Sequence, residues 1–150
     1  MSPLIMRRAT PHDWQKIATF LATADLPLAG AEAHLCDYFL AFRDDLLIGS
    51  AGLERYGDTG LLRSLAVAVP ERGHGLGQAL VKHLLTYATS LRVRQVVLLT
   101  TTAADFFLRF GFQPISRAEF PMAAQASVEF REACAASATA MSIALVEEQR

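Results

Sequence analysis

The stretch between residues 65 and 78 constrains the fold more than any other part of the sequence, because it joins an apolar run to a helical pattern through a glycine-rich turn. Residues 61–69 (LLRSLAVAV) are predicted to form a strand. Gly73, Gly75 and Gly77 follow, and apolar side chains then recur at helical spacing. The sequence therefore predicts a strand, a glycine turn and a helix in that order.

Such a turn is suited to binding an anion. Backbone N–H groups at the start of a helix lack partners within the helix, so they can donate to phosphate oxygens while the helix dipole adds attraction. Glycines remove the β-carbons that would hold a pyrophosphate away from the backbone. The turn lacks the Lys-Ser/Thr ending of a P-loop and does not match GxGxxG. An ordinary flexible loop is the alternative interpretation.

The remaining pattern predicts one domain over residues 1–150, of the α/β class or, under a stricter naming, α+β. Turn signals at residues 44–45 and 57–60 separate three consecutive antiparallel strands. The predicted strands cover residues 4–9, 38–43, 46–55, 61–69, 93–100 and 138–146. The predicted helices follow Thr10 as far as Pro27 and cover 31–37, a segment from Gly77 onward, 103–109 and roughly 122–133.

Composition argues against several classes of protein. The chain has 150 residues, 52% of them hydrophobic, and a formal net charge of −1, without the strongly basic balance of a nucleic-acid-binding domain. Cys36 and Cys134 lie far apart and lack metal-ligand spacing. The sequence has neither an apolar leader nor a run long enough to span a membrane. We therefore expect a soluble cytoplasmic protein with no metal, no nucleic-acid partner and no membrane segment.

Two motifs resemble those of the GNAT superfamily of N-acetyltransferases. Arg72-x-x-Gly75-x-Gly77 is similar to the Q/R-x-x-G-x-G/A signature that holds the pyrophosphate of acetyl-CoA, and residues 106–112 (FFLRFGF) resemble the family's F-Y-E-K-L-G-F segment. The resemblance implies a mixed, mostly antiparallel sheet with helices on both faces and a splayed central strand pair. It implies acetyl-CoA as co-substrate, bound by Leu65, Ala66, Val67, Arg72, Gly73, His74, Gly75, Leu76, Gly77, Gln78, Thr100 and Phe107.

The sequence departs from the family pattern at two positions of this cofactor site. Phe107 stands where many members have a tyrosine that can protonate the departing thiolate, and a phenylalanine cannot donate a proton. Its role is then either core packing or an apolar wall beside the pantetheine. Thr100 occupies a position that is often asparagine, and its hydroxyl can still bond the cofactor.

The catalytic base and the substrate contacts are less evident. Residues 61–69 contain no acidic side chain, so Glu54 on the preceding strand is the candidate base, acting through water. The alternative for Glu54 is a solvated residue or a partner of Arg55 or Arg63. Arg63 and Ser64 are candidate substrate-binding residues, because either can bond a carboxylate or an oxyanion. The alternative is a surface arginine with a small neighbour.

A narrower resemblance concerns the acceptor. Residues 61–67, 98–107 and 129–141 resemble the arsenic-resistance-associated subgroup of GNAT N-acetyltransferases. The resemblance implies direct acetyl transfer to the primary amine of a small molecule, such as an amino-acid-like or organoarsenical compound. A non-catalytic acyl-CoA-binding sensor and a protein N-acetyltransferase are the alternatives. A homodimer is compatible with the sequence.

Overall fold

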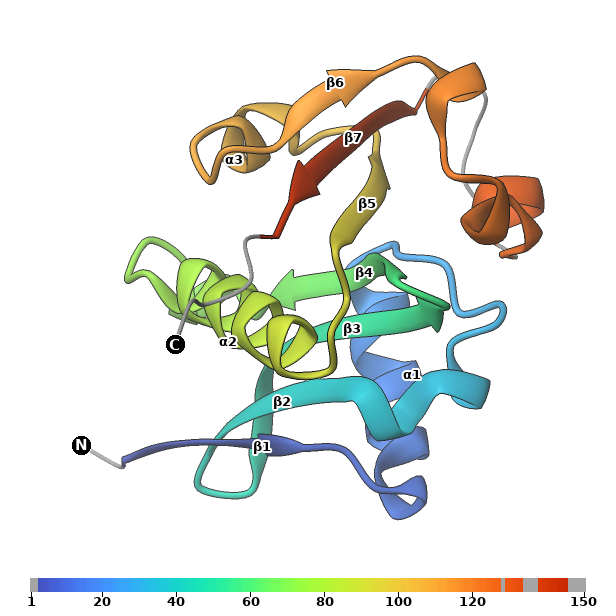
Figure 1. Cartoon of the computed structure of the whole chain (residues 1–150). Helices are drawn as coiled ribbons and strands as arrows, with labels where there is room; N and C mark the ends of the chain where they lie inside the picture. The colour runs from blue at the N-terminus through green and yellow to red at the C-terminus, as the bar shows by residue number, and fades with distance from the viewer. Residues whose placement is uncertain (1–2, 128, 134–137, 146–150) are drawn as a thin grey trace.

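A seven-stranded sheet with the order β1-β2-β3-β4-β5-β7-β6 forms the centre of the molecule (Figure 1). The computed structural model describes residues 3–127, 129–133 and 138–145. Within them, β4 and β5 are parallel and the other neighbouring strands pair antiparallel. The strands are β1 (Leu4–Arg8), β2 (Tyr38–Arg43), β3 (Leu46–Tyr56), β4 (Thr59–Val67), β5 (Gln95–Thr100), β6 (Gln113–Ile115) and β7 (Thr139–Ala144).

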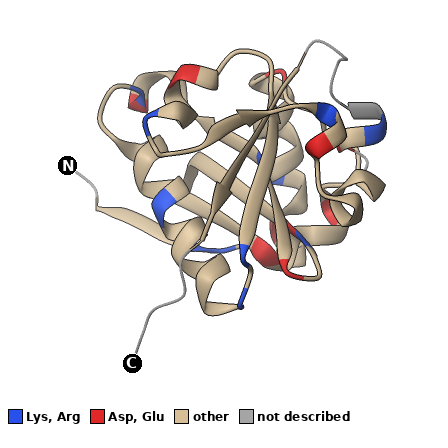
Figure 2. Ribbon diagram, turned by 45° about the horizontal axis from the view of Figure 1, so that its top comes forward, with Lys and Arg blue, Asp and Glu red and all other residues tan. Residues whose placement is uncertain are grey.

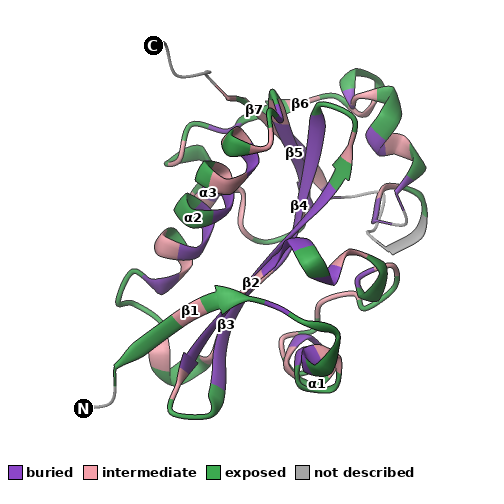
Figure 3. Cartoon of the chain, turned by 60° about the horizontal axis from the view of Figure 1, so that its bottom comes forward, coloured by how far each residue is buried: buried purple, intermediate pink, exposed green. Residues whose placement is uncertain are grey.

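Helices cover both faces of this sheet, as the resemblance to the GNAT superfamily implied. Helix α2 packs on one face with the aromatic side chains that follow β5, and α1 packs on the other face with η2 and β2 (Figure 3). The buried residues concentrate on the central strands, whereas the edge strand β1 is largely exposed. The helical elements are η1 (Pro11–Asp13), α1 (Trp14–Thr23), η2 (Glu32–Asp37), η3 (Val69–Glu71), α2 (Leu76–Ser90), α3 (Ala104–Leu108), η4 (Arg117–Glu119), η5 (Met122–Ala126) and η6 (Glu129–Ala133).

The apolar stripe predicted from Gly77 onward is what attaches α2 to the sheet. Leu80, Val81 and Leu84 are fully buried, and each such side chain contributes about 1.5–3 kcal/mol of hydrophobic stabilisation. Gly49 on β3 allows this close approach, because a β-carbon there would lie 2.9 Å from a Leu80 methyl group. The helix therefore lies directly on β3, and its N-terminal end is fixed next to the end of β4.

The parallel pair β4 and β5 separates after a short ladder. The pairing runs from Thr59 opposite Gln95 to Leu61 opposite Val97, and the remainder of β5 pairs with β7 alone. Figure 1 shows β5 diverging from β4 beyond this point. The splayed central strand pair expected from the sequence is confirmed, and it opens the sheet beside the C-terminal half of β4.

Several predicted elements differ in extent from those observed, and the first helix ends at Thr23 rather than continuing to Pro27. Residues 122–133 do not form one helix, because Ser127 has an extended backbone at the end of η5 and its hydroxyl accepts the backbone N–H of Phe130. The strand predicted at 61–69 begins earlier, at Thr59, and ends at Val67, since Pro70 lies in the short η3 turn. Cys134 and Val146 lie outside the described residues.

Charged residues of both signs are interspersed along the ribbon in Figure 2, in keeping with the net charge of −1. Across the described residues, His, Cys, Asp and Glu side chains form no group of three or more that could hold a metal ion. In the same part of the chain, no helix combines the length and apolarity needed to cross a membrane.

Candidate active site

The separation of β4 and β5 creates a cavity of about 250 Å³. Residues from both strands, from α3 and from the loop that follows α1 line it. Five side chains singled out from the sequence meet there, although up to 44 positions separate them: Arg63, Ser64, Leu65, Thr100 and Phe107. The structure therefore brings together residues that the sequence assigned to both substrate and cofactor binding.

A bulge in β4 shapes one wall of this cavity. Ser50 pairs with Ala66 and Gly52 with Arg63, so two residues of β4 face one residue of β3. Ser64 lies in this bulge with a φ of 60°, a left-handed conformation that is costly for a residue with a β-carbon. Such strain needs support from neighbouring groups, and two hydrogen bonds supply it.

The first of these bonds joins the Ser64 hydroxyl to that of Tyr38, at 2.7 Å. The second runs from the Ser50 hydroxyl to the Ser64 carbonyl, also 2.7 Å long. Tyr38 is fully buried, and burial raises the pKa of its phenol to about 12, against the opposing influence of Arg63 and Ser64. Tyr38 is therefore a neutral hydroxyl at physiological pH and holds the bulge in place.

The glycine turn has the open backbone that an anion cradle requires. Gly73 has a φ of 83° and Gly75, the N-cap of α2, a φ of 86°, both in the left-handed region that glycine adopts freely. A β-carbon at either position would meet no atom within 4 Å. Side chains of the turn therefore do not crowd these two positions, and the helix dipole favours a negative charge at the N-terminus of α2.

The side chains of Arg72, His74 and Leu76, in the same turn, have different surroundings. The Nε of Arg72 donates to the Val67 carbonyl at the end of β4, at 2.9 Å. His74 is exposed, and its Nδ1 lies 3.4 Å from the Glu71 carbonyl. Leu76 is buried in the core beneath α2, so its contribution to a ligand is restricted to its backbone.

Beside the turn lies a shallow hollow of about 450 Å³ lined by Gly75, Gln78, Ala79, Lys82, Arg109 and Phe110. Lys82 and Arg109 add two positive charges to the amides of the turn. Sequence reasoning missed both of these residues. Helical spacing was the available signal for Lys82, because it follows Gln78 by four residues and must share its face of α2.

Arg63 is the centre of a buried ion cluster rather than a surface residue. Its side chain is fully buried, with Nη1 2.9 Å from Glu54 and Nη2 3.6 Å from Glu129. The same nitrogens donate to the carbonyls of Ala29 and Pro27, at 2.8 and 2.9 Å. Burial opposes its charge, but the carboxylates of Glu129 and Glu54 outweigh burial and raise the pKa of the guanidinium. The donors of Arg63 are thus engaged with protein acceptors.

Glu54 is buried as well, being only 1% exposed, so it is not a solvated strand residue. Of the two partners considered from the sequence it binds Arg63, whereas Arg55 pairs with Asp37. The Tyr56 hydroxyl donates to its other oxygen at 2.5 Å. Glu54 is absent from the cavity lining and lies behind Arg63, so a base acting from this position would have to work through intervening groups.

Thr100 and Phe107 form the opposite wall, on the side of β5. The Thr100 hydroxyl accepts the backbone N–H of Ala103 at 2.9 Å, which fixes the turn into α3. Phe107 is 4% exposed and packs edge-on against Phe106 and Phe112, with ring centroids 5.1 and 5.4 Å away. Both possibilities left open for Phe107 are compatible with this position, since the ring belongs to the core and also lines the cavity.

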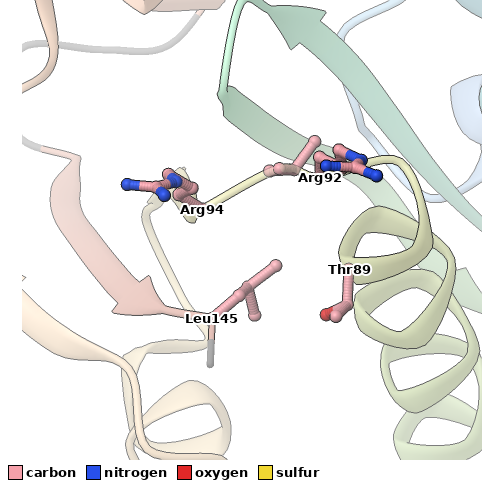
Figure 4. A pocket seen from close by; sticks show the side chains of 5 residues that line it. Thr89, Arg92, Arg94 and Leu145 are labelled. Carbon is pink, nitrogen blue, oxygen red and sulfur yellow. The ribbon is translucent and has the colours of Figure 1, made fainter. Parts of the chain in front are cut away.

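Another hollow, of about 320 Å³, lies at the far end of α2 (Figure 4). Its lining contains Thr89, Arg92, Arg94 and Leu145. The guanidinium groups of Arg92 and Arg94 point away from each other, so they do not converge on one ligand. This hollow contains none of the residues that the sequence singled out.

The splayed strand pair and the glycine turn agree with the fold that the resemblance to the GNAT superfamily implied. The model of the GNAT acetyltransferase domain family matches residues 34–114, more than half of the chain. The chain belongs to this family.

Solved structures share this fold over almost the whole chain. An N-acetylglutamate synthase from Neisseria gonorrhoeae, complexed with coenzyme A and N-acetyl-glutamate, has a TM-score of 0.83 at 21% identity and covers 98% of this chain and 36% of its own. Rv2747 from Mycobacterium tuberculosis, in complex with CoA, has a TM-score of 0.76 at 24% identity and covers 95% of this chain and 99% of its own. At these identities the likeness shows the fold alone.

Curated relatives match part of the chain. An amino-acid acetyltransferase of Mycobacterium tuberculosis is 35% identical over 83 residues, which cover 53% of this chain and 47% of that protein. An amino-acid acetyltransferase of Neisseria meningitidis is 28% identical over 92 residues, 60% of this chain and 21% of that protein. The chain thus spans about a fifth to a half of the length of these relatives. Their names do not support the arsenic-resistance subgroup.

Proposed function

We propose that the protein is an acetyl-CoA-dependent N-acetyltransferase that moves an acetyl group to the primary amine of a small, amino-acid-like molecule. The observation that carries this proposal is the cavity between β4 and β5, where Ser64, Leu65, Thr100 and Phe107 meet. It opens beside a part of β4 that has no partner strand on its β5 side. The glycine turn follows the same strand directly.

The two ends of the cofactor match two parts of this surface. The backbone of Leu65, Ala66 and Val67 can pair with the amides of the pantetheine arm, as an added strand pairs with a sheet edge. The amides from Gly73 to Gly77 can receive the pyrophosphate at the N-terminus of α2. Lys82 and Arg109 stand where further phosphate oxygens would benefit from positive charge.

The reaction in this proposal is a direct transfer. The neutral amine nitrogen attacks the carbonyl carbon of the thioester, the carbon–sulfur bond breaks, the thiolate of CoA leaves with the electron pair, and the new amide nitrogen releases one proton to solvent or to a base. Phe107 has no proton to give, so the thiolate takes its proton from another group or from water. Holding the two reactants together supplies much of the acceleration, because the encounter becomes effectively unimolecular.

The proposed class of acceptor is supported by the names of the curated relatives and by segments of the sequence. Curated relatives named amino-acid acetyltransferases favour an amino acid or a close analogue. The sequence phrases at 61–67, 98–107 and 129–141 are the support for an organoarsenical amino acid as one member of that class. A peptide amine is the acceptor expected of a protein N-acetyltransferase.

A thiol-release assay with acetyl-CoA tests the proposal. The amines to compare are glycine, lysine, glutamate, an organoarsenical amino acid, a polyamine and a peptide. Release of free CoA that requires one of the small amines supports the proposal. Tight acetyl-CoA binding without release in the presence of any amine would instead indicate a cofactor-binding sensor.

A further inference from the structure

We propose that the Ser64 hydroxyl, oriented by Tyr38, is a catalytic hydrogen-bond donor to the carbonyl oxygen of the acetyl group, where negative charge develops as the amine attacks. This inference rests on the proposed function, because it names a group that stabilises the charge formed in that transfer. Sequence reasoning named Ser64 as a substrate contact but did not single out Tyr38.

Ser64 lies where the cavity meets the proposed path of the cofactor. It lines the cavity between β4 and β5 together with Thr100 and Phe107. In the proposed binding mode the pyrophosphate lies at the glycine turn after β4, and the pantetheine arm runs back along residues 67 to 65. Ser64 is the next residue of β4 in that direction. The thioester at the end of the arm is therefore delivered beside Ser64.

Two neighbouring groups converge on the hydroxyl oxygen of Ser64. The Tyr38 hydroxyl lies 2.7 Å from Ser64 Oγ, and Arg63 Nε lies 3.3 Å from the same atom. The guanidinium has donors and no acceptor, so Arg63 donates to Ser64. In the pair with Tyr38, either oxygen is able to donate.

Burial decides which hydroxyl donates in that pair. Tyr38 is 0% exposed, and among the described residues its hydroxyl has a hydrogen bond with Ser64 alone. With Ser64 as donor, the phenol proton would be buried without an acceptor, which is costly. With Tyr38 as donor, the remaining proton is that of Ser64, which borders the cavity, where water or a ligand can accept it. Tyr38 therefore donates, and the Ser64 proton is available to a bound ligand.

These contacts make Ser64 a stronger donor without making it an acid. Hydrogen bonds in a chain polarise one another, and one of the two that Ser64 accepts comes from the cationic Arg63. A serine hydroxyl is a much weaker acid than a thiol, so it keeps its proton and does not protonate the CoA thiolate. Its hydrogen bond strengthens as the attack of the amine turns the carbonyl oxygen into an oxyanion. The oxyanion then collapses, which restores the carbonyl and expels the thiolate.

Infrared spectroscopy of bound acetyl-CoA tests this hydrogen bond without any turnover. The acetyl-CoA carries carbon-13 at its carbonyl, and each protein is saturated with it in the absence of an amine. A donor to the carbonyl oxygen weakens the C=O bond, so the carbonyl stretch should lie at a lower frequency in the wild type than in Ser64→Ala. Ser90→Ala, which removes an exposed hydroxyl at the end of α2, is the control and should match the wild type. Equal frequencies in the wild type and Ser64→Ala would overturn the proposal.

Steady-state kinetics test the role of Tyr38 as a positioning residue. Ser64→Ala should lower kcat by about a hundredfold to a thousandfold, the size of losing one oxyanion donor, with little change in the KM for the amine. Tyr38→Phe should lower kcat by less, because Ser64 keeps its hydroxyl. Since Tyr38 acts through Ser64, the double variant Tyr38→Phe/Ser64→Ala should have the kcat of Ser64→Ala. A further fall of kcat in the double variant would contradict this role.

The double variant also keeps the test available if Ser64→Ala does not fold, because it leaves no buried phenol without a partner. Its kcat and its carbonyl frequency are then compared directly with those of Tyr38→Phe. Wild-type turnover with an unchanged kcat in Ser64→Ala would refute this inference and leave the acetyltransferase intact. Absence of wild-type turnover with every amine would contradict the proposed function, whereas the infrared comparison would still decide whether Ser64 binds the carbonyl oxygen.

Discussion

Arg63 on β4 and Glu54 on β3 form an ion pair with an Nη1 to Oε2 distance of 2.9 Å, and their side chains are 0 and 1% exposed. Arg63 lines the cavity between β4 and β5, whereas Glu54 does not. Arg63 also connects that cavity to the loop after α1, because it donates to the carbonyls of Pro27 and Ala29. The conformation of the loop and the shape of the site therefore depend on the same guanidinium.

Glu54→Gln is expected to reduce stability more than turnover. Replacing the Glu54 carboxylate by an uncharged amide weakens the charge-assisted hydrogen bond from Arg63, which is worth about 1.5–3 kcal/mol, while Glu129 still contacts the guanidinium. Urea unfolding should therefore show a lower midpoint, with acetyl-CoA binding retained in the folded protein. If Glu54 were the base, kcat of Glu54→Gln would instead fall by about a hundredfold or more. That loss would disappear as the pH approaches the pKa of the substrate amine.

Gly52→Ala is expected to impair both stability and turnover. A β-carbon at Gly52 would lie 2.2 Å from the ring of Tyr38, which is fully buried and cannot move aside without displacing Ser64. Overpacking of this kind costs about 3 kcal/mol. Gly57→Ala is the control, because the added β-carbon meets nothing within 4 Å. Its cost is limited to the left-handed backbone conformation, which destabilises an alanine by about 1 kcal/mol. Equal effects of the two variants on turnover would contradict a role for the bulge.

The element order was predictable from the sequence because periodicity and turn signals are local. The β2–β3 hairpin, the strand-turn-helix around the glycines and the stripe on α2 each depend on a few neighbouring residues. The break in segment 122–133 was not predictable from the sequence, since the spacing of its apolar residues also fits one continuous helix. The Ser127 hydroxyl interrupts that helix by accepting the backbone N–H of Phe130, a bond that only the folded chain shows.

Some residues of the candidate site were likewise predictable from the sequence, and others were not. The glycine turn, Thr100 and Phe107 belong to motifs with fixed spacing, so their positions could be anticipated. The burial of Arg63 could not, because it depends on the bulge in β4 and on partners up to 66 positions away in the sequence. Glu129 carries no local signal at all. Only the folded chain places its carboxylate beside Arg63.

Phe107→Leu is expected to act through packing. The ring contacts Phe106 and Phe112 and has no titratable proton, so its replacement should cost about 1 kcal/mol of stability. Turnover should fall by much less than a thousandfold, which would correspond to about 4 kcal/mol of barrier. Single-turnover kinetics of a folded variant with normal acetyl-CoA affinity check this. A loss beyond that size would show that Phe107 does more than fill space.

Acid should weaken the attachment of β1 to α1. Arg7 donates to both oxygens of Asp13, each at 2.9 Å, and these bonds hold the pKa of the Asp13 carboxyl well below its ordinary value of 3.8. A lowered folded-state pKa contributes stability above the unfolded value and loses it as the pH falls below that value.

The urea midpoint of the wild-type protein should therefore approach that of Asp13→Asn between pH 5 and pH 2.5, a window of about one to two pH units on either side of the unfolded pKa. Asp45→Asn, at an exposed turn, should show no such convergence with the wild type. A constant difference between wild type and Asp13→Asn across this range would refute the linkage.

The central claim is that the surface formed by β4, the glycine turn and the splayed strands binds acetyl-CoA and delivers its acetyl group to an amine. The most direct test is to supply acetyl-CoA with an isotopically labelled acetyl group and follow the label by mass spectrometry. With the wild-type protein, the label should appear in an amide of a small amine. With a folded Gly75→Glu variant, which places bulk and negative charge at the start of α2, it should not. Equal labelling by both proteins, or no labelled amide with any amine despite bound acetyl-CoA, would contradict the account.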